Sequence, residues 1–328
     1  MKLVVWILGA VVVLAGGAFA FLVVKKPATT APSTIRVELT AERLQRGKYI
    51  FETLSSCEDC HSRRDISRFS GPIEPGTAGR GFVWPPELGL PGKLVSPNIT
   101  SDVETGIGSW TDGDILRAFR EGVSKDGRAL FPFMPYQHFR EMSDEDAYSV
   151  VAYLRRLPPI KSKMSVSEMN FPVNLFMKFA PKPVNGAVKA PDKANRLEYG
   201  KYLVTVAGCG ICHTKMEKGD PIEGMEFAGG EEFNMGPWMA RSANISPDPE
   251  TGIGKWSEDK FVAKFKGYAN LTYESAPKTV QANFTVMPWM AFSQLTEDDL
   301  RAIFTYLKTV KEVRHSVETH PPVALPRS

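Results

Sequence analysis

CEDCH at residues 57–61 recurs as CGICH at residues 209–213, and these two short stretches decide how the rest of the chain is interpreted. The chain has 328 residues and four cysteines, and all four cysteines lie in the two stretches. Two of the five histidines directly follow the two cysteine pairs. No cysteine is therefore left for a separate disulfide, a catalytic thiol or another metal ligand.

The Cys-x-x-Cys-His pattern is typical of covalent haem attachment. Two cysteines three residues apart on a tight helical turn can form thioether bonds to the two vinyl groups of one porphyrin, and the next histidine can bind the iron. The sequence therefore predicts two covalently bound haem c groups, attached through two sets of residues: Cys57, Cys60 and His61, and Cys209, Cys212 and His213.

Three other interpretations of the cysteine pairs are weaker. A zinc site would place its second cysteine pair roughly 15 to 20 residues from the first, whereas Cys60 and Cys209 are far apart in the sequence. A thioredoxin-like redox pair would lie in a βαβ unit, and no such pattern surrounds either motif. Structural disulfides would not explain a histidine in the same place twice.

The two motifs belong to a longer internal repeat, which is the signature of duplicated units. Five pairs of segments recur in the same order: GKY at 47–49 and 200–202, the two cysteine motifs, SPNITSDVETGIGSW at 96–110 and SANISPDPETGIGKW at 242–256, FMPY at 133–136 and VMPW at 286–289, and MSDEDAYSVVAYLRRL at 142–157 and LTEDDLRAIFTYLKTV at 295–310. The repeat predicts two copies of one domain, residues 38–158 and 190–312, called here the first and second repeats.

The repeat also selects candidates for the second axial iron ligand, which is commonly methionine in electron-transfer cytochromes. Met134 and Met287 precede a proline and an aromatic residue at matching positions. Met134 follows His61 by 73 residues, and Met287 follows His213 by 74 residues. We therefore expect iron ligation by His61 and Met134 in one repeat and by His213 and Met287 in the other. The rivals are His138 in the first repeat and Met239 or Met290 in the second.

Two further pairs of matching residues have open roles. Trp110 and Trp256 end the most similar segment, where each can anchor the following helix in the core or contact a haem propionate through its indole N–H. Asn98 and Asn244 can act as loop-capping residues, which is a common role for asparagine.

The secondary structure is predicted to be helical. Ser143 with Asp146 and Thr296 with Asp299 have the spacing of helix caps, and apolar residues follow at helical intervals. Further helices are expected after Thr111 and after Ser257. Between the helices the chain is rich in glycine and proline and has little alternation of period two, which favours long loops around a bulky cofactor. The expected fold class is all-α.

The N-terminal segment is predicted to cross a membrane. Residues 3–24 are apolar or small throughout, which is long enough to span a bilayer core of roughly 30 Å. A cleaved signal peptide is the alternative, with Ala18-Phe19-Ala20 as the cleavage site. An uncleaved anchor is favoured because the apolar run continues past that site. Either interpretation exports the rest of the chain.

The remaining segments complete the predicted organisation: residues 1–26 form the anchor or signal segment, 27–37 a tether, 159–189 a linker, and 313–328 a C-terminal tail. The apolar stretch at 171–177 has three alternative interpretations: the linker packs across the two domains, docks a partner or contacts a membrane surface. The net charge of +3 argues against nucleic acid as a partner.

With these motifs, the chain resembles the multihaem cytochrome c subunits of bacterial membrane-bound alcohol and gluconate dehydrogenases. The likeness extends over about residues 40 to 312. Its most specific parts are segments 96–110 and 242–256, which end in TGIGxW, and the linker stretch NFPVNLFMKF. The resemblance implies all-α class I cytochrome c domains with haem attached in the periplasm. Together with the repeat and the N-terminal apolar segment, this predicts two tandem class I domains after an N-terminal transmembrane helix anchored in the bacterial inner membrane. The membrane attachment of those subunits is usually placed elsewhere in the chain. Those subunits typically carry three Cys-x-x-Cys-His motifs, and this chain has two.

The predicted function is electron transfer by a dihaem cytochrome c in a periplasmic or membrane respiratory chain. An iron closed by methionine has no vacancy for a substrate, so the chain is expected to be an electron carrier, alone or as the cytochrome subunit of an oxidoreductase complex, and not an enzyme. Its expected partners are a dehydrogenase, a quinol-linked complex or a terminal oxidase. The alternative is a dihaem enzyme, such as a peroxidase, with one haem able to open to substrate, for which His138 is the candidate residue.

Overall fold

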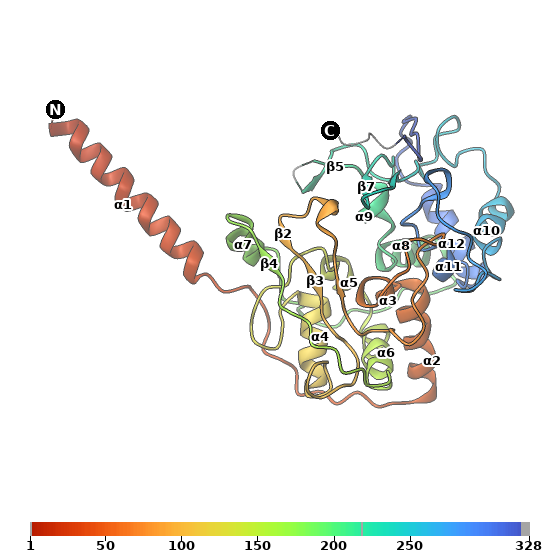
Figure 1. Cartoon of the computed structure of the whole chain (residues 1–328), viewed down its shortest axis with the longest axis horizontal. Coiled ribbons are helices and arrows are strands. Elements are labelled where there is room, and N and C mark those ends of the chain that lie inside the picture. Colours follow the sequence, from red (N-terminus) through yellow and green to blue (C-terminus); the bar gives the residue numbers. More distant parts are fainter. Residues whose placement is uncertain (1, 218, 323–328) are drawn as a thin grey trace.

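The computed structural model describes residues 2–217 and 219–322, and it is helix-rich (Figure 1). Helix α1 (Lys2–Val24) projects from the body of the molecule, and none of its residues is buried. At 1.5 Å per residue its length is about 35 Å, enough for a membrane span. By length and composition it is the one candidate span in the described part of the chain, and a signal sequence would have the same character.

The first repeat consists of helices connected by long loops. Its helical segments are α2 (Ala41–Tyr49), the π-helical turn η1 (Ile50–Leu54), α3 (Cys57–His61), η2 (Pro86–Leu88), α4 (Asp112–Glu121), α5 (Tyr136–Phe139) and α6 (Asp144–Leu154). Its strands are β1 (Phe82–Val83), β2 (Gly92–Lys93) and β3 (Val95–Ser96). The cysteine motif thus occupies one short helix at the end of a continuous run of helical turns.

The second repeat has the same order of main helices. Its helical segments are α8 (Arg196–Val206), α9 (Cys209–His213), α10 (Glu258–Lys266), η4 (Gln281–Asn283), α11 (Trp289–Phe292) and α12 (Glu297–Leu307). Its strands are β5 (Met216–Glu217), β6 (Asp220–Pro221), β7 (Glu232–Asn234) and β8 (Met239–Arg241). The helices α8, α9, α10, α11 and α12 correspond to α2, α3, α4, α5 and α6.

Four short antiparallel ribbons add β-structure to this helical framework. The pairs are β1 with β3, β5 with β6, β7 with β8, and β2 with β4 (Glu168–Met169) of the linker. Each strand has only two or three residues, too few to produce a visible alternation of apolar and polar side chains. The described structure is therefore helix-rich with small ribbons, where the sequence predicted helices alone.

In each repeat the first and last helices cross at a glycine. A Cβ atom on Gly47 of α2 would lie 1.9 Å from the carbonyl oxygen of Ser149 in α6. A Cβ atom on Gly200 of α8 would lie 2.0 Å from the carbonyl oxygen of Ala302 in α12. Only glycine permits backbones to approach this closely, which explains why the Gly-Lys-Tyr segment recurs.

The buried apolar core extends over both repeats. It includes Ile50, Leu54 and Val151 of the first repeat and Leu203 and Leu300 of the second, each with almost no exposed surface. The helices begin where the sequence predicted, because the side chains of Thr111, Ser143, Ser257 and Thr296 each accept a hydrogen bond from the backbone N–H three residues on. Capping and apolar spacing thus fix the framework that carries the two motifs.

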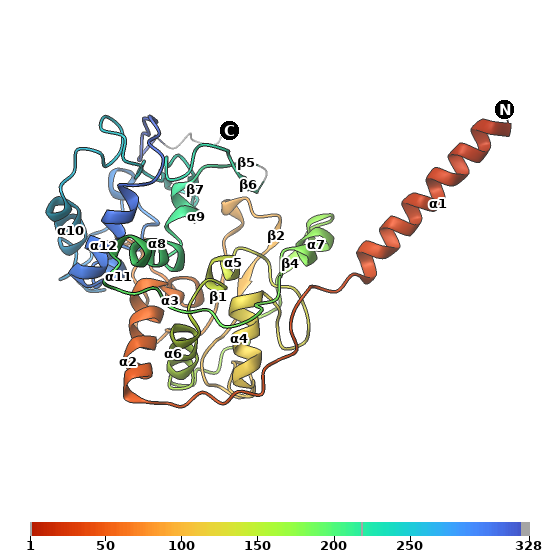
Figure 2. The ribbon, with the colours of Figure 1, turned by 180° about the vertical axis from the view of Figure 1, so that it is seen from behind.

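The linker and the tether both pack on the first repeat. The linker contributes β4, α7 (Val173–Phe176) and the 3₁₀ turn η3 (Met177–Phe179), and the N–H of Asp144 donates to the carbonyl of Val188. Thr29 and Thr30 of the tether hydrogen-bond the carboxylate of Glu121 in α4. Figures 1 and 2 place α7 beside the end of α1 in both views.

Candidate functional site

A residue with left-handed backbone conformation directly precedes each cysteine motif. Ser56 precedes α3 with φ 47° and ψ 46°, and Gly208 precedes α9 with φ 69° and ψ 26°. This conformation costs an ordinary residue roughly 1–2 kcal/mol, so the same sharp entry in both repeats indicates a geometric requirement. It lets a single helical turn carry both cysteines and the histidine, and in the first repeat Cys57 and His61 line one cavity.

The two histidines make the same hydrogen bond. Nδ1 of His61 lies 2.9 Å from the carbonyl oxygen of Pro97, and Nδ1 of His213 lies 2.7 Å from the carbonyl oxygen of Ala243. A carbonyl oxygen can only accept, so Nδ1 carries the proton and Nε2 keeps its lone pair. Burial lowers the pKa of both histidines, which favours this neutral form. Each histidine is therefore prepared to bind a metal through Nε2.

Asn98 and Asn244 hold the loops that supply these carbonyls. The side-chain amide of Asn98 donates to the carbonyl of Ile160 over 2.7 Å, and that of Asn244 donates to the carbonyl of Val313 over 2.8 Å. Each Oδ1 accepts the N–H two residues on, from Thr100 and Ser246 respectively. The asparagines are thus loop-capping residues, and the segments after residues 158 and 312 fold back onto the repeat that precedes each of them.

An apolar cavity of about 780 Å³ adjoins the first motif. It is lined by Cys57 and His61 of α3 and by Met134 from the loop before α5. The remaining lining is largely apolar and includes Phe51, Ile107, Trp110, Ile115, Phe119 and Leu154. Pockets of this size and character are those that hold large cofactors.

Met287 has the local setting of Met134. Each methionine carbonyl accepts a hydrogen bond from the N–H two residues on, Tyr136 in one repeat and Trp289 in the other, over 2.8 Å. Both methionines are partly buried against the core. Ser70 of the first repeat donates to the Met287 carbonyl over 2.9 Å, so the second loop is also held by the other repeat.

The rival ligands have different environments. His138 lies on α5 and is not among the residues that line the cavity of His61 and Met134. In the second repeat Met239 begins strand β8, where its N–H donates to the side-chain oxygen of Gln281, and Met290 lies within α11. The assignment of Met134 and Met287 as iron ligands stays a prediction, and the geometry of the first cavity favours Met134 over His138.

The four cysteines are unpaired thiols. Burial raises the pKa of Cys212 to about 11 and, together with Cys212, that of Cys209 to about 12. Reactive thiols have lowered pKa values instead. Within residues 2–217 and 219–322, no group of three or more metal-binding His, Cys, Asp or Glu side chains is present. These observations disfavour the zinc and thioredoxin-like interpretations.

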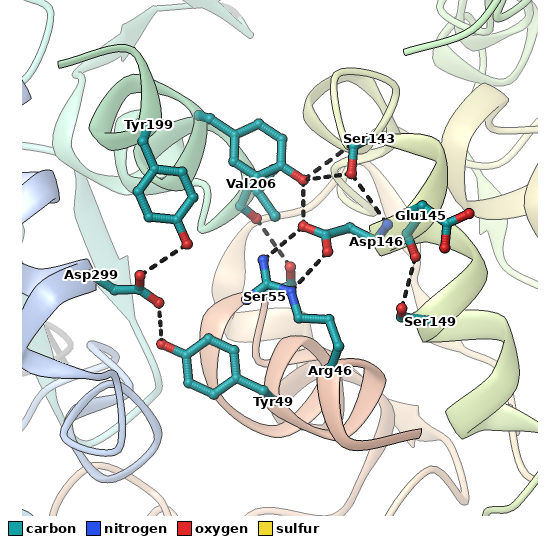
Figure 3. Close-up of polar contacts among 11 residues, drawn as sticks. Arg46, Tyr49, Ser55, Ser143, Glu145, Asp146, Ser149, Tyr199, Val206 and Asp299 are labelled. Atoms are coloured by element: carbon teal, nitrogen blue, oxygen red, sulfur yellow. Dashed lines mark hydrogen bonds and ion pairs between the residues drawn. The ribbon is translucent and has the colours of Figure 1, made fainter. Parts of the chain in front are cut away.

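Two tyrosines cross between the repeats close to the motifs. The Tyr49 hydroxyl donates to Asp299 over 2.5 Å and accepts the N–H of Thr296 over 3.2 Å. The Tyr202 hydroxyl makes the matching contacts in the opposite direction, with Asp146 over 2.6 Å and the N–H of Ser143 over 3.2 Å. Figure 3 shows Tyr49 and Asp299 meeting in this way.

The crossing brings the two motifs near each other. The Ser55 hydroxyl donates to the carbonyl of Val206 over 3.2 Å (Figure 3). Ser55 lies one residue before Ser56, which precedes α3, and Val206 lies two residues before Gly208, which precedes α9. Burial, Asp59 and the neighbouring thiol of Cys212 raise the pKa of Cys60 to about 12.

The residues present fit a covalently attached haem. Each repeat offers two thiols on one helical turn and a histidine with a free Nε2, and in the first repeat a methionine thioether lines the same apolar cavity. Sequence reasoning did not identify the carbonyls of Pro97 and Ala243 or the roles of Tyr49 and Tyr202. One sequence signal could have identified the tyrosines: GKY recurs in both repeats, and so do the capping aspartates Asp146 and Asp299.

A family model for cytochrome c matches residues 197–311. The chain is 29% identical over 289 residues to the cytochrome c subunit of alcohol dehydrogenase (quinone) from Gluconobacter oxydans, which covers 82% of this chain and 55% of the relative. It is 30% identical over 284 residues to the gluconate 2-dehydrogenase cytochrome c subunit from Pantoea cypripedii, with coverages of 81% and 59%. The chain thus spans little more than half the length of these two relatives.

A third relative has nearly the same length as this chain. The diheme cytochrome c-type protein from Cereibacter sphaeroides is 28% identical over 309 residues, which cover 93% of this chain and 97% of the relative. The resemblance to cytochrome c subunits is confirmed, and residues 197–311 form a cytochrome c domain, which implies covalently bound haem c. These three relatives are named as two cytochrome c subunits of dehydrogenases and a diheme cytochrome c-type protein.

Proposed function

We propose that this chain, whose residues 197–311 form a cytochrome c domain, is a dihaem cytochrome c that transfers electrons. Its two haem domains would be the tandem repeats, residues 38–158 and 190–312, each of class I type. The attaching residues would be Cys57, Cys60 and His61 in one and Cys209, Cys212 and His213 in the other. Met134 and Met287 would be the second axial ligands.

The duplicated histidine geometry carries this proposal. In both repeats a backbone carbonyl holds Nδ1, and a buried asparagine fastens the loop that bears the carbonyl. Such an arrangement fixes the ring orientation and directs Nε2 to one metal position. Its repetition supports two iron sites of one design.

Electron transfer is favoured over substrate chemistry because an iron held by both a histidine and a methionine would have no open position for a substrate. Bound haem would supply one-electron redox chemistry, for which the protein needs to provide fixed ligands and low exposure to water. Met134 and His61 line the same largely apolar cavity, so these two side chains could both bind one iron. The hydrogen bond between Ser55 and Val206, which lie next to the two motifs, supports a short path between the two haems.

The proposed location is the bacterial inner membrane, with α1 as an uncleaved anchor and both haem domains in the periplasm. The length of α1 and its lack of buried residues support a span. The relatives named as dehydrogenase subunits support a dehydrogenase as electron donor. A quinol-linked complex or a terminal oxidase would be the other redox partner in a respiratory chain.

A haem count with spectroscopy tests the proposal. Alkaline pyridine treatment of the purified protein should give two c-type haems per chain. The oxidised protein should show the weak red absorption band of methionine-ligated ferric haem. Met134→Ala and Met287→Ala should each remove the band of one haem and lower the reduction potential of that haem. Met239→Ala is the matched control for the second repeat and should change neither property.

Two outcomes would contradict the assignment. A high-spin ferric signal at either haem of the unaltered protein would indicate an open iron position and favour the dihaem enzyme. An unchanged spectrum in both methionine variants would show that other residues complete the iron coordination.

A further inference from the structure

The linker segment 171–179 has an unusual concentration of exposed aromatic surface. Phe171 is 70% exposed, Phe176 is 56% exposed and Phe179 is 45% exposed. Phe171 lies two residues before α7, Phe176 ends α7 and Phe179 ends η3. Contiguous exposed apolar surface in a globular protein marks a contact with a protein, a ligand or a membrane.

The same segment contacts the end of helix α1. The ammonium group of Lys178 donates to the carbonyl oxygens of Leu22 and Val23 over 3.2 and 2.8 Å. These carbonyls belong to the last turn of α1, where no further helical turn supplies N–H groups. The Lys25 ammonium group in turn lies 5.5 Å from the centre of the Phe179 ring. The exposed aromatic segment is thus fixed beside the point where α1 ends.

A second attachment fixes the first repeat next to the end of α1. Five residues after α1 ends, Thr29 donates to Glu121 over 2.5 Å, and the N–H and hydroxyl of Thr30 donate to the same carboxylate over 2.8 Å each. The N–H of Val184, which follows η3 in the linker, also donates to Glu121 over 3.0 Å. The tether therefore cannot act as a long flexible spacer between α1 and the first repeat.

The composition of the segment suits the surface of a bilayer. Residues 170–191 contain three lysines and no aspartate or glutamate, and Lys25 and Lys26 lie at the end of α1. Interfacial segments combine apolar side chains in the acyl boundary with lysines that reach anionic headgroups. Both views of the molecule show α7 next to the end of α1 (Figures 1 and 2).

We propose that segment 171–179 is a second membrane contact, which inserts its phenylalanines into the phospholipid headgroup boundary where α1 leaves the bilayer. The inference rests on the proposed role of α1 as an anchor. Cys57, His61 and Met134 line a cavity whose other lining residues include Val24, Lys25, Met177 and Lys178. The contact therefore holds the first haem site against the membrane surface and leaves the second repeat further away.

Cleavage of the anchor tests the contact. The full haem-loaded chain, with a protease site inserted between Lys26 and Pro27, is placed in protein-free vesicles of phosphatidylethanolamine and phosphatidylglycerol. After cleavage the haem-containing body is collected and offered fresh vesicles, and flotation measures the haem absorbance that binds. We expect binding by the unaltered body and a reduction of about tenfold or more for Phe171→Ser/Phe176→Ser/Phe179→Ser.

A matched control removes equally exposed apolar side chains elsewhere. Val103 is 67% exposed and Val280 is 54% exposed, so Val103→Ser/Val280→Ser should leave vesicle binding unchanged. If the triple variant loses its haems, Phe171→Ser alone provides the same comparison at the most exposed position.

Two results would overturn the membrane contact. One is an unaltered body that binds fresh vesicles no better than the triple variant. The other is binding to native membranes but not to protein-free vesicles, which would assign the segment to a protein partner. Release of the uncut chain from vesicles would instead refute the anchor of the proposed function, while rebinding of the cut body would still decide the membrane contact.

Discussion

Asp146 and Asp299 occupy the same place in the two repeats, the third residue of the last helix, yet they have different local partners. Asp146 accepts two hydrogen bonds from the guanidinium group of Arg46, over 2.8 and 2.7 Å. Tyr199, which stands at the position of Arg46 in the second repeat, donates one hydrogen bond to Asp299 over 2.9 Å. Figure 3 shows the two carboxylates with these different partners.

The contact that both carboxylates share comes from the opposite repeat. Tyr202 reaches Asp146 and Tyr49 reaches Asp299. The common element is therefore the crossing tyrosine, while the charge of the local partner differs. We infer that this fold needs the connection between the repeats, and that neutralising the buried carboxylate is secondary.

The largest effects are expected where the two repeats are alike. Gly47→Ala would drive a Cβ atom into the Ser149 carbonyl, and Gly200→Ala would drive one into the Ala302 carbonyl. Each substitution should lower the free energy of unfolding by about 3 kcal/mol, because the helix crossing has to open. Denaturant unfolding of the haem-loaded protein measures the loss.

A glycine with much more space than Gly47 or Gly200 is the control for these substitutions. Gly267 ends α10 with a helical backbone, and its added Cβ would lie 3.3 Å from the nearest carbonyl oxygen. Gly267→Ala should therefore change stability much less. A large loss for Gly47→Ala with almost none for Gly200→Ala would show that the two crossings are not equivalent.

Much of this framework could be predicted from the sequence. Capping residues at Ser143 and Thr296, followed by apolar residues at helical spacing, correctly placed the last helix of each repeat. Local signals of this kind depend on neighbours within one or two turns. The Cys-x-x-Cys-His motifs are equally local, and the matching methionines were found because the chain could be compared with itself.

The remaining features depend on residues far apart in the sequence. Tyr49 and Asp299 are separated by 250 residues, so no periodicity links them. The carbonyls that hold His61 and His213 belong to the backbone, which carries no residue-type signal. The contact of Lys178 with α1 likewise joins residues more than 150 positions apart, although the apolar character of the linker was visible in the sequence.

A smaller effect should separate the two crossing tyrosines. Tyr49→Phe removes the hydrogen bond to buried Asp299 and leaves the N–H of Thr296 without this acceptor, so we expect a loss of about 2 kcal/mol. Tyr202→Phe should cost about 1 kcal/mol, because Asp146 keeps its charged partner Arg46. Denaturant unfolding of both variants gives the order.

A swap of the local partner sharpens this test. Arg46→Tyr makes the first repeat resemble the second, so the cost of Tyr202→Phe in that background should rise toward the cost of Tyr49→Phe. Equal costs for the two tyrosine variants in the unaltered protein would show that the local partner of the carboxylate has no influence.

The smallest effect concerns Glu121, which binds the tether to the first repeat. Burial acts to raise the pKa of Glu121, but the hydrogen bonds from Thr29, Val184 and Thr30 outweigh it and hold this pKa below its ordinary value of 4.5. A carboxyl whose pKa is lowered by folding stabilises the folded state above its ordinary pKa and loses that contribution as the pH falls through the lowered value. Its contribution at neutral pH should be about 1 kcal/mol.

Glu121→Gln tests this contribution and its sign. At neutral pH the variant should exchange the amide hydrogens of Thr30 and Val184 several-fold faster than the unaltered protein, since a charge-assisted hydrogen bond is stronger than a neutral one. The difference should shrink as the pH falls through the lowered pKa of Glu121, which is below 4.5, because the unaltered carboxyl then becomes neutral as well. Hydrogen exchange with mass spectrometry of peptides covering residues 28–34 and 182–188 measures both rates. A difference that stays constant with pH would mean that the charge of Glu121 does not hold the tether.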